Sequence, residues 1–378
     1  MKNLNSLTLV LSILFTVFLS CKQTSKKVEK DQIIKNVDAS LFLTNNSLSI
    51  DTVNCILSDG TKTKCFQITT SSIPEDHEMG PWCPHTINDG SEKGGIWFKD
   101  GKMYDVDGEF IKELPKLYHD DFWKLYDTNG DVFRTKSEDD CIKLMGAQLQ
   151  DEFINYCIEC LPKYVSNLSS TYRIPITPIK LEAPINLSGD PQGGNPPHGE
   201  RGGPPPNHDR DGENPTNENH EGPPQDINSE GERPNGPPPN GPPPGDNEGE
   251  RLGGPIKRGI AFNGVIFDAP APLHIILEGY TIPPIDDAGG HINMDNGYHY
   301  HAATGKTKEH AQHDHHAPMI GYAMDGFGLY AQLNTEGNVP EDLDECRGHY
   351  DDIRGYHYHV DAAGNNNFIN CFSGAIAK

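Results

Sequence analysis

The sequence predicts an α+β, β-rich fold of mainly antiparallel sheets with one longer helix, interrupted by a disordered Pro/Gly-rich insertion. Three observations lead to this prediction. Short apolar segments are separated by Asp-Gly dipeptides, which favour β-hairpins. One stretch carries apolar residues at helical spacing. Between two apolar parts of the chain lies a long tract in which Pro, Gly, Asn and Glu dominate.

The part before the tract, residues 45–186, carries strand and hairpin signals. Residues 96–98, 102–106 and 109–111 are short extended segments, and Asp-Gly pairs at 100–101 and 107–108 separate them as predicted hairpin turns.

A helix is predicted over 138–162. Ser137 is its N-cap and Asp140 completes a box-like start. Apolar residues then recur at helical spacing, which indicates a core face: Ile142, Met145, Leu149, Phe153, Cys157 and Leu161.

Residues 187–254 form the low-complexity tract. A segment so poor in apolar residues buries too little surface to offset its chain entropy, so we expect it to be disordered. After it, residues 260–267 predict one strand with a kink at Gly264. Residues 320–323 and 327–330 flank Asp325-Gly326 as a further hairpin.

The N-terminus predicts export. An apolar run over 7–19 is too short to span a membrane comfortably and fits the core of a signal peptide. It ends at Phe18-Leu19-Ser20-Cys21, which resembles a bacterial lipobox, so residues 1–21 are predicted to be a lipoprotein signal peptide and Cys21 to be lipidated. The alternative is an ordinary signal peptide with an incidental cysteine. Residues 22–44 are then a polar tether. The protein is predicted to be extracytoplasmic and anchored to the membrane through Cys21, at the periplasmic face or the cell surface.

Charge and cysteine content narrow the function. The formal net charge of −24 argues against binding a nucleic-acid backbone, which needs clustered Lys and Arg. Beyond Cys21 an even number of cysteines remains, which suggests disulfides in an exported protein. Cys346 with Cys371 is the favoured pair, because they bracket the second motif described below; the other pairings stay open. Cys157 and Cys160 form a C-x-x-C, but no thioredoxin-like strand precedes it.

One motif, D-x3-G-H-x5-G-Y-H-Y-H, occurs twice, from Asp286 to His301 and from Asp344 to His359. Alternate side chains of a strand share a face, so the two histidines of each Y-H-Y-H point one way and the tyrosines the other. Two imidazoles about 7 Å apart at the backbone can converge on one ion, and the Gly-His histidine adds a third nitrogen. Such a set suits Cu, Zn, Fe or Ni.

The predicted metal ligands come from both copies and from the segment between them: His291, His299, His301, His316, His349, His357 and His359. Asp286 and Asp344 are candidate carboxylate ligands or groups that orient a histidine. Asp325 is a candidate general base, although Asp-Gly is more often only a turn. Two alternatives to the metal site stay open: a structural network in which each imidazole pairs with its own carboxylate or carbonyl, and metal-free catalysis.

These residues resemble the YHYH-domain proteins. Both G-Y-H-Y-H segments match the motif that names the family, residues 316–327 look like its H-S-P-x-I-G-Y-A-x-D-G-F run, and 342–349 are similar to its D-L-D-E-C-N-G-H segment. The ending 370–374 looks like its G-C-x-x-G, and 73–77 and 80–84 are similar to its I-P-x-H and G-P-W-C-P elements.

The resemblance implies one discontinuous domain, formed by 45–186 and 255–378 around the insertion, and an exported location, but no activity. The sequence departs from the family pattern at Arg347, where Asn is usual. The first copy also has no cysteine that matches Cys346, so the resemblance implies a disulfide at the second copy alone.

Three functions are therefore considered: an extracytoplasmic metal-binding domain, a surface binding or adhesion module in which the motif is a scaffold, and metal sequestration without catalysis. If the protein is an enzyme, an open metal position would activate water or oxygen. The sequence contains no nucleophile elbow, phosphate loop or dinucleotide fingerprint, and it names no substrate or surface ligand.

Overall fold

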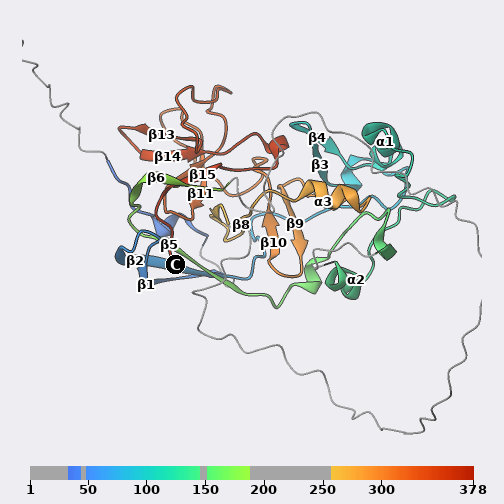
Figure 1. Ribbon diagram of the computed structural model, residues 1–378, viewed down its shortest axis with the longest axis horizontal. Helices are drawn as coiled ribbons and strands as arrows, with labels where there is room; N and C mark the ends of the chain where they lie inside the picture. Colours follow the sequence, from blue (N-terminus) through green and yellow to red (C-terminus); the bar gives the residue numbers. More distant parts are fainter. Residues whose placement is uncertain (1–32, 44–47, 145–150, 188–256) are drawn as a thin grey trace, which may run out of the picture. The chain divides into compact units, whose positions relative to one another are not determined.

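The computed structural model describes residues 33–43, 48–144, 151–187 and 257–378 (Figure 1). The predicted signal peptide with Cys21, most of the tether and nearly all of the predicted disordered insertion lie outside these residues. In the described part of the chain, no helix is long and apolar enough to cross a membrane. The predicted β-rich, mainly antiparallel fold is confirmed.

The largest sheet has eight strands in the order β13-β14-β12-β11-β7-β8-β10-β9. All of them come from the part of the chain after the insertion. Their bounds are β7 Gly259–Ala261, β8 Ile266–Phe267, β9 Gly290–Asn293, β10 Gly297–Tyr300, β11 Met319–Ala323, β12 Gly328–Tyr330, β13 Gly348–Asp351 and β14 Gly355–His359.

This sheet consists of two equivalent halves. β7 and β11 pair antiparallel at its centre, with Ile260 opposite Tyr322. From there each half repeats the same pairings outward: an antiparallel hairpin, a parallel neighbour and a second antiparallel hairpin. The duplication seen in the His/Tyr motif therefore extends over four strands, and a pseudo-two-fold axis passes between β7 and β11.

The first central hairpin corrects a sequence prediction. Residues 260–267 form β7, a turn and β8 rather than one kinked strand. Gly264 adopts a φ of +83°, and the Asn263 side chain accepts a hydrogen bond from the Val265 amide. The turn thus matches the hairpin predicted and found at Asp325-Gly326, where Gly326 has a φ of +87°.

Residues 109–111, predicted to be extended, lie in helix α1, Gly108–Tyr118. The Asp107 side chain accepts a hydrogen bond from the Phe110 amide at 2.8 Å and so caps the helix. Asp107-Gly108 therefore starts a helix instead of turning a hairpin. The hairpin predicted around Asp100-Gly101 is confirmed as β3, Ile96–Lys99, paired with β4, Lys102–Asp105.

The long helix predicted over 138–162 is wrong beyond its first turns. The capping box at Ser137 and Asp140 is present, but α2 covers only Glu138–Lys143. Disulfides explain the difference. Cys141 bonds Cys160 with their Cα atoms 5.9 Å apart, whereas a continuous helix would separate them by about 28 Å. A second disulfide joins Cys157 to Cys83, far outside the predicted helix.

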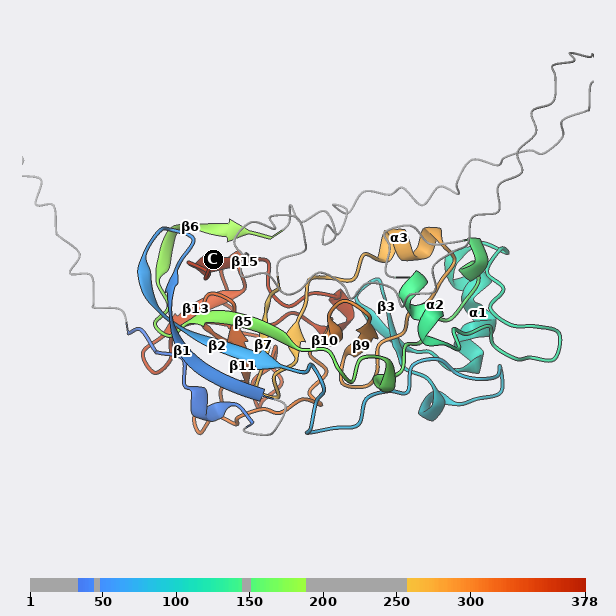
Figure 2. The same cartoon turned by 90° about the horizontal axis from the view of Figure 1, so that it is seen from below.

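One small sheet joins the two parts of the chain that flank the insertion. Strand β6, Lys180–Asn186, pairs with β15, Cys371–Gly374, near the C-terminus (Figure 2). A separate sheet has the order β1-β2-β5. The bounds not yet given are β1 Leu48–Ile56, β2 Lys62–Thr70, β5 Ser170–Pro175, α3 Leu273–Glu278, and the short 3-10 helices Ala39–Leu41, Ser91–Lys93, Asp151–Phe153, Pro162–Tyr164 and Ala363–Asn365.

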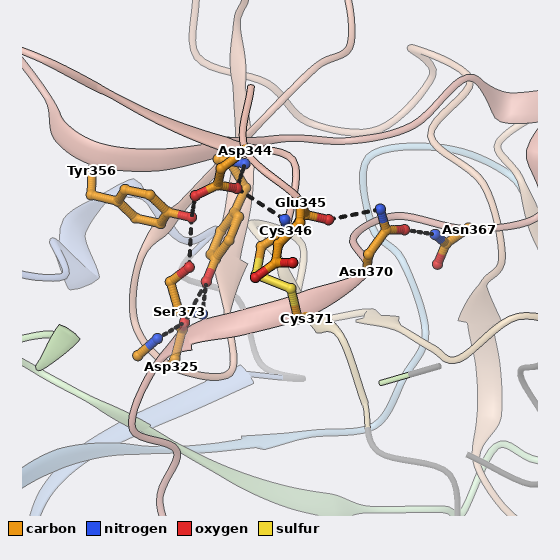
Figure 3. The surroundings of a disulfide bond; sticks show 12 residues. Asp325, Asp344, Glu345, Cys346, Tyr356, Asn367, Asn370, Cys371 and Ser373 are labelled. Atoms are coloured by element: carbon orange, nitrogen blue, oxygen red, sulfur yellow. Dashed lines mark hydrogen bonds between the residues drawn. A yellow bond between two sulfur atoms is a disulfide. The ribbon is translucent and has the colours of Figure 1, made fainter. Parts of the chain in front are cut away.

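The eight cysteines of the described residues form four disulfides. The predicted Cys346–Cys371 bond is confirmed, with Cα atoms 4.7 Å apart (Figure 3). The others join Cys55 to Cys65, Cys83 to Cys157 and Cys141 to Cys160. The two cysteines of the C-x-x-C therefore have different partners and form no redox pair.

The tyrosines of the motif hold the outer hairpins in place. The Tyr356 hydroxyl donates to Asp344 at 2.7 Å (Figure 3). The same carboxylate accepts the Gly348 amide at 2.9 Å. In the first half, Tyr298 and Gly290 donate to Asp286 in the same way. Each motif thus ties its aspartate, glycine and first tyrosine into one network; Asp286 is buried in the first, whereas Asp344 is exposed in the second.

This network corrects the roles expected for three aspartates. Asp286 and Asp344 bind tyrosine hydroxyls and turn amides, and Asp325 accepts from the Tyr358 hydroxyl at 2.6 Å and the Gly374 amide at 2.9 Å. Alternate residues of β10 and β14 point to opposite faces, so the tyrosines lie on one face of the sheet and the histidines on the other. The three aspartates bind tyrosine hydroxyls and therefore lie on the tyrosine face. None of them accepts a hydrogen bond from a histidine, and Asp325 is fully buried with Oδ2 bound to Tyr358 and Gly374, so a substrate has no access to it as a general base.

The glycine of each Gly-His pair makes room for the tyrosine. A Cβ on Gly348 would lie 2.1 Å from the Tyr356 hydroxyl oxygen. We therefore expect Gly348→Ala to lower the free energy of unfolding by about 1–3 kcal/mol, because the ring must move out of its network. Denaturant unfolding with the disulfides intact measures the change. Gly90→Ala is the control, since its Cβ would meet only the flexible end of exposed Glu92. Equal stability of both variants would contradict the packing described.

Candidate metal centres

Three histidines of the first half meet on the face of the sheet opposite the tyrosines. His291 on β9 lies opposite His299 on β10, and His301 follows directly after β10. The Nε2 atom of His291 is 3.1 Å from Nε2 of His299 and 3.2 Å from Nε2 of His301. We call this set site 1.

Four histidines form the corresponding cluster of the second half, called site 2. His349 on β13 faces His357 on β14, with 3.0 Å between their Nε2 atoms. His316, which precedes β11, adds a fourth ring. Its Nε2 lies 3.0 Å from that of His357 and 3.2 Å from that of His359.

The other ring nitrogen, Nδ1, fixes where the protons are. His316 Nδ1 lies 3.0 Å from the Ala317 carbonyl, His357 Nδ1 2.9 Å from that of Gly355, and His359 Nδ1 2.9 Å from that of Ala331. A carbonyl oxygen can only accept a hydrogen bond, so each Nδ1 carries the hydrogen. In the neutral ring, Nε2 is then unprotonated and has a free lone pair. In site 1, His299 and His301 bind the Gly297 and Ala269 carbonyls in the same manner, at 3.0 and 2.8 Å.

The short contacts of site 2 therefore bring lone pairs together. Between His316 and both His357 and His359 no proton is available to form a hydrogen bond, and such an approach is repulsive unless a cation lies between the nitrogens. Ligand nitrogens about 2.0–2.1 Å from a tetrahedral ion are about 3.3–3.4 Å apart. The spacing of 3.0–3.2 Å is close to that value. Both groups of histidines could hold a metal ion.

Burial keeps these imidazoles neutral. Desolvation lowers the pKa of His291, His299 and His301 to about 3, and their mutual repulsion adds to the effect. Desolvation likewise lowers the pKa of His359 to about 3 and that of His357 to about 4. Neutral imidazole is the form that binds metals, so the rings need no deprotonation at neutral pH.

The two sites have different surroundings. Site 2 borders a cavity of about 630 Å³ whose lining includes His316, His349, His359 and the charged Asp351 and Arg354.

Site 1 borders a smaller and mostly apolar cavity of about 160 Å³, which His291 lines together with Trp82 and the cysteines of the Cys141–Cys160 disulfide. Exchange with solvent is therefore easier at site 2.

All seven histidines predicted as ligands lie in one of the two clusters. Site 1 is made by one copy of the motif alone, and site 2 by one copy plus His316. His310 and His313, between the copies, stay outside: His310 Nε2 binds the Leu41 carbonyl at 2.9 Å, and His313 is exposed. At Nδ1, each carbonyl-bound histidine has the hydrogen bond that the structural-network alternative predicts. At Nε2, it points towards the neighbouring histidines, as the metal-site hypothesis predicts.

Sequence reasoning missed three carboxylates beside the clusters. Asp342 Oδ1 lies 2.8 Å from Nδ1 of His349, on the side of the ring away from the cluster. The other two approach Nε2 atoms. Asp268 Oδ2 is 4.0 Å from His299 Nε2, and Asp351 Oδ2 is 3.9 Å from His357 Nε2. Asp268 lies outside the repeated motif and carries no sequence signal. Asp351 occupies an unspecified position within it and differs from Asn293, its counterpart in the first copy.

The comparison with family models agrees with the resemblance found in the sequence. Residues 245–342 match the YHYH protein family. The matched range contains the first motif copy, the central hairpins and His316, and it ends before Asp344. The prediction of a YHYH domain is thereby confirmed for this range. Among curated proteins and among solved structures, no match was found.

The lowered histidine pKa values predict acid sensitivity of the metal-free protein. Unfolded histidines titrate near 6.5, whereas the YHYH histidines do so near 3 to 4 when folded. The unfolded state therefore gains protons first, and stability that is complete above pH 6.5 falls as the pH drops towards 3. The expected slope is about 1.4 kcal/mol per pH unit for each such histidine.

Denaturant unfolding in a chelator at several pH values measures this slope. Replacing His299 and His301 by Gln should flatten it, whereas the exposed-residue control His313→Ala should leave it unchanged. Asp325 acts in the opposite direction, because desolvation raises its pKa to about 6, but this contribution is common to all variants. A stability independent of pH between 6.5 and 4 would contradict the neutral, buried clusters.

Proposed function

We propose that this YHYH-domain protein binds transition-metal ions at two sites. His291, His299 and His301 would hold one ion, and His316, His349, His357 and His359 the other. The observation that carries the proposal is the contact of unprotonated Nε2 atoms in site 2, which a cation would turn from repulsion into coordination. Neutral imidazole ligands suit Cu, Zn, Fe or Ni. A bound ion would supply Lewis acidity or, for a redox-active metal, electron transfer.

The proposed location is outside the cytoplasm, with the protein anchored to a bacterial membrane by a lipid on Cys21. Four disulfides are consistent with an oxidising compartment. The anchor rests on the signal-peptide pattern and the lipobox-like Phe18-Leu19-Ser20-Cys21. We propose the membrane as a partner through this lipid, and no nucleic acid as a partner, in view of the negative charge.

A surface-binding module with a structural motif is the second candidate. The tyrosine face favours it, because Tyr298, Tyr356 and Tyr358 each bind an aspartate and serve packing. The histidine face distinguishes the two candidates, since a purely structural network has no need to bring Nε2 lone pairs together. Metal sequestration without catalysis would use the same two sites, with the easier exchange at site 2.

Metal content tests the proposal directly. The disulfide-bonded chain from Lys22 onward, without a tag, is equilibrated with Cu²⁺, Zn²⁺, Fe²⁺ or Ni²⁺, and the bound ion is measured by elemental analysis. We expect two ions per chain for at least one metal. His299→Ala with His301→Ala should remove one ion, and His357→Ala with His359→Ala the other.

His310→Ala with His313→Ala is the matched control and should keep both ions, since these residues lie outside the clusters. Circular dichroism shows that each variant is folded. No bound ion with any of the four metals would overturn the proposal and leave the histidines a structural role.

A further inference from the structure

The two halves of the large sheet place different side chains around otherwise equivalent histidines. Phe267 pairs with Tyr300 in the first half, as Leu329 pairs with Tyr358 in the second. By this register the next residue, Asp268, occupies the place of Tyr330. His301 Nδ1 binds the Ala269 carbonyl and His359 Nδ1 the Ala331 carbonyl, which confirms the correspondence independently.

Each half nevertheless places one carboxylate oxygen near the equivalent histidine, the first of its Y-H-Y-H. Asp268 Oδ2 lies 4.0 Å from Nε2 of His299, the first histidine of its Y-H-Y-H. Asp351 Oδ2 lies 3.9 Å from Nε2 of His357, the equivalent histidine of the second copy. The two aspartates are not equivalent in the repeat: Asp268 follows β8, whereas Asp351 ends β13, where the first half has Asn293.

A cation holds each of these oxygens. Lys257 Nζ is 2.6 Å from Asp268 Oδ2, and the Arg354 guanidinium contacts Asp351 Oδ2. Asp268 is buried, and Lys257 is the cation paired with its carboxylate. A carboxylate, a cation and a histidine Nε2 thus meet in the same order at both sites, although the residues come from different positions of the duplicated unit.

The distances place these oxygens within reach of a shared ion. Two atoms that each lie about 2.0–2.2 Å from one ion are at most about 4.0–4.4 Å apart. At 4.0 and 3.9 Å, the carboxylates are near that limit, where they act on the ion through their charge or through a water that it binds. A divalent ion surrounded by neutral imidazoles alone would be a poorly compensated buried charge, which is costly.

We infer that Asp268 and Asp351 are the charge-compensating carboxylates of site 1 and site 2, and that both sites are therefore built for divalent rather than monovalent transition-metal ions. This inference rests on the proposed function. Both aspartates are positioning residues that complement the imidazole ligands. Lys257 and Arg354 compete with the ion for the same oxygens and so moderate the affinity.

The test measures Ni²⁺ or Zn²⁺ affinity at one site at a time. Site 1 is isolated in the chain that carries His357→Ala and His359→Ala, and site 2 in the chain that carries His299→Ala and His301→Ala. We expect Asp268→Asn at site 1, and Asp351→Asn at site 2, to weaken divalent binding by about 10–100-fold. Cu⁺ binding, measured anaerobically by competition with a chromophoric chelator, should change much less. Exposed Asp287→Asn is the control at site 1.

A second pair of variants keeps the test independent of folding defects. Lys257→Gln and Arg354→Gln should tighten divalent binding at their own sites, because each frees a carboxylate oxygen, and a misfolded variant would bind less rather than more. Two divalent ions in the parent chain with unchanged affinities in Asp268→Asn and Asp351→Asn would overturn this inference but leave the two metal sites standing. A parent chain that binds no metal would overturn both. Equal losses for Cu⁺ and the divalent ions would contradict the preference for charge.

Discussion

The arrangement depends on one interaction: the hydrogen bond from histidine Nδ1 to a backbone carbonyl. For His316, His357 and His359 this bond fixes the tautomer and turns each ring so that Nε2 faces its neighbours. Gly355 supplies its carbonyl from β14, Ala331 directly follows β12, and Ala317 lies two residues before β11, so the sheet positions all three carbonyls. The geometry of the cluster is therefore set before any ion arrives, and an ion would find lone pairs already converging.

The sheet separates two tasks on its two faces. Because residues alternate along β10 and β14, the tyrosines face the core while the histidines face the opposite side. Tyr298, Tyr356 and Tyr358 bind Asp286, Asp344 and Asp325, and Tyr300 binds Asn263. The tyrosine networks join each outer hairpin to its motif aspartate, independently of the histidine face. Duplication then gave two such units, joined through β7 and β11. They diverged at their edges, where His316 has no described counterpart in site 1 and Asp268 takes the place of Tyr330.

Features that depend on residues close in sequence could be predicted, whereas features that depend on contacts between distant segments could not. The repeat itself, the alternation of Tyr and His, the hairpins at Asp100-Gly101 and Asp325-Gly326, and the Cys346–Cys371 disulfide could all be predicted. The sequence could not show that the helix over 138–162 is wrong, because the apolar spacing does fit a helix. Only the disulfide partners of Cys141 and Cys157 contradict it, and connectivity cannot be read from sequence.

Other features left too little trace in the sequence. The central hairpins share little beyond an Asn/Asp-Gly turn, so their equivalence emerges only from strand register. Asp286 and Asp344 looked like ligands because they recur with the histidines, yet their constant partner is a tyrosine. Asp268 follows β8 and lies near His299 only because β8 and β10 pair in the sheet. No sequence spacing could predict this contact.

The most direct measurement is anomalous X-ray diffraction at the metal absorption edge, from crystals of the disulfide-bonded ectodomain equilibrated with the ion that it binds. Two histidine sites predict two peaks per chain, one among His291, His299 and His301 and one among His316, His349, His357 and His359. Each peak should lie about 2.0–2.1 Å from the Nε2 atoms around it. An absence of peaks at both clusters, or ions bound elsewhere on the acidic surface, would contradict the assignment of the duplicated motif as a pair of metal sites.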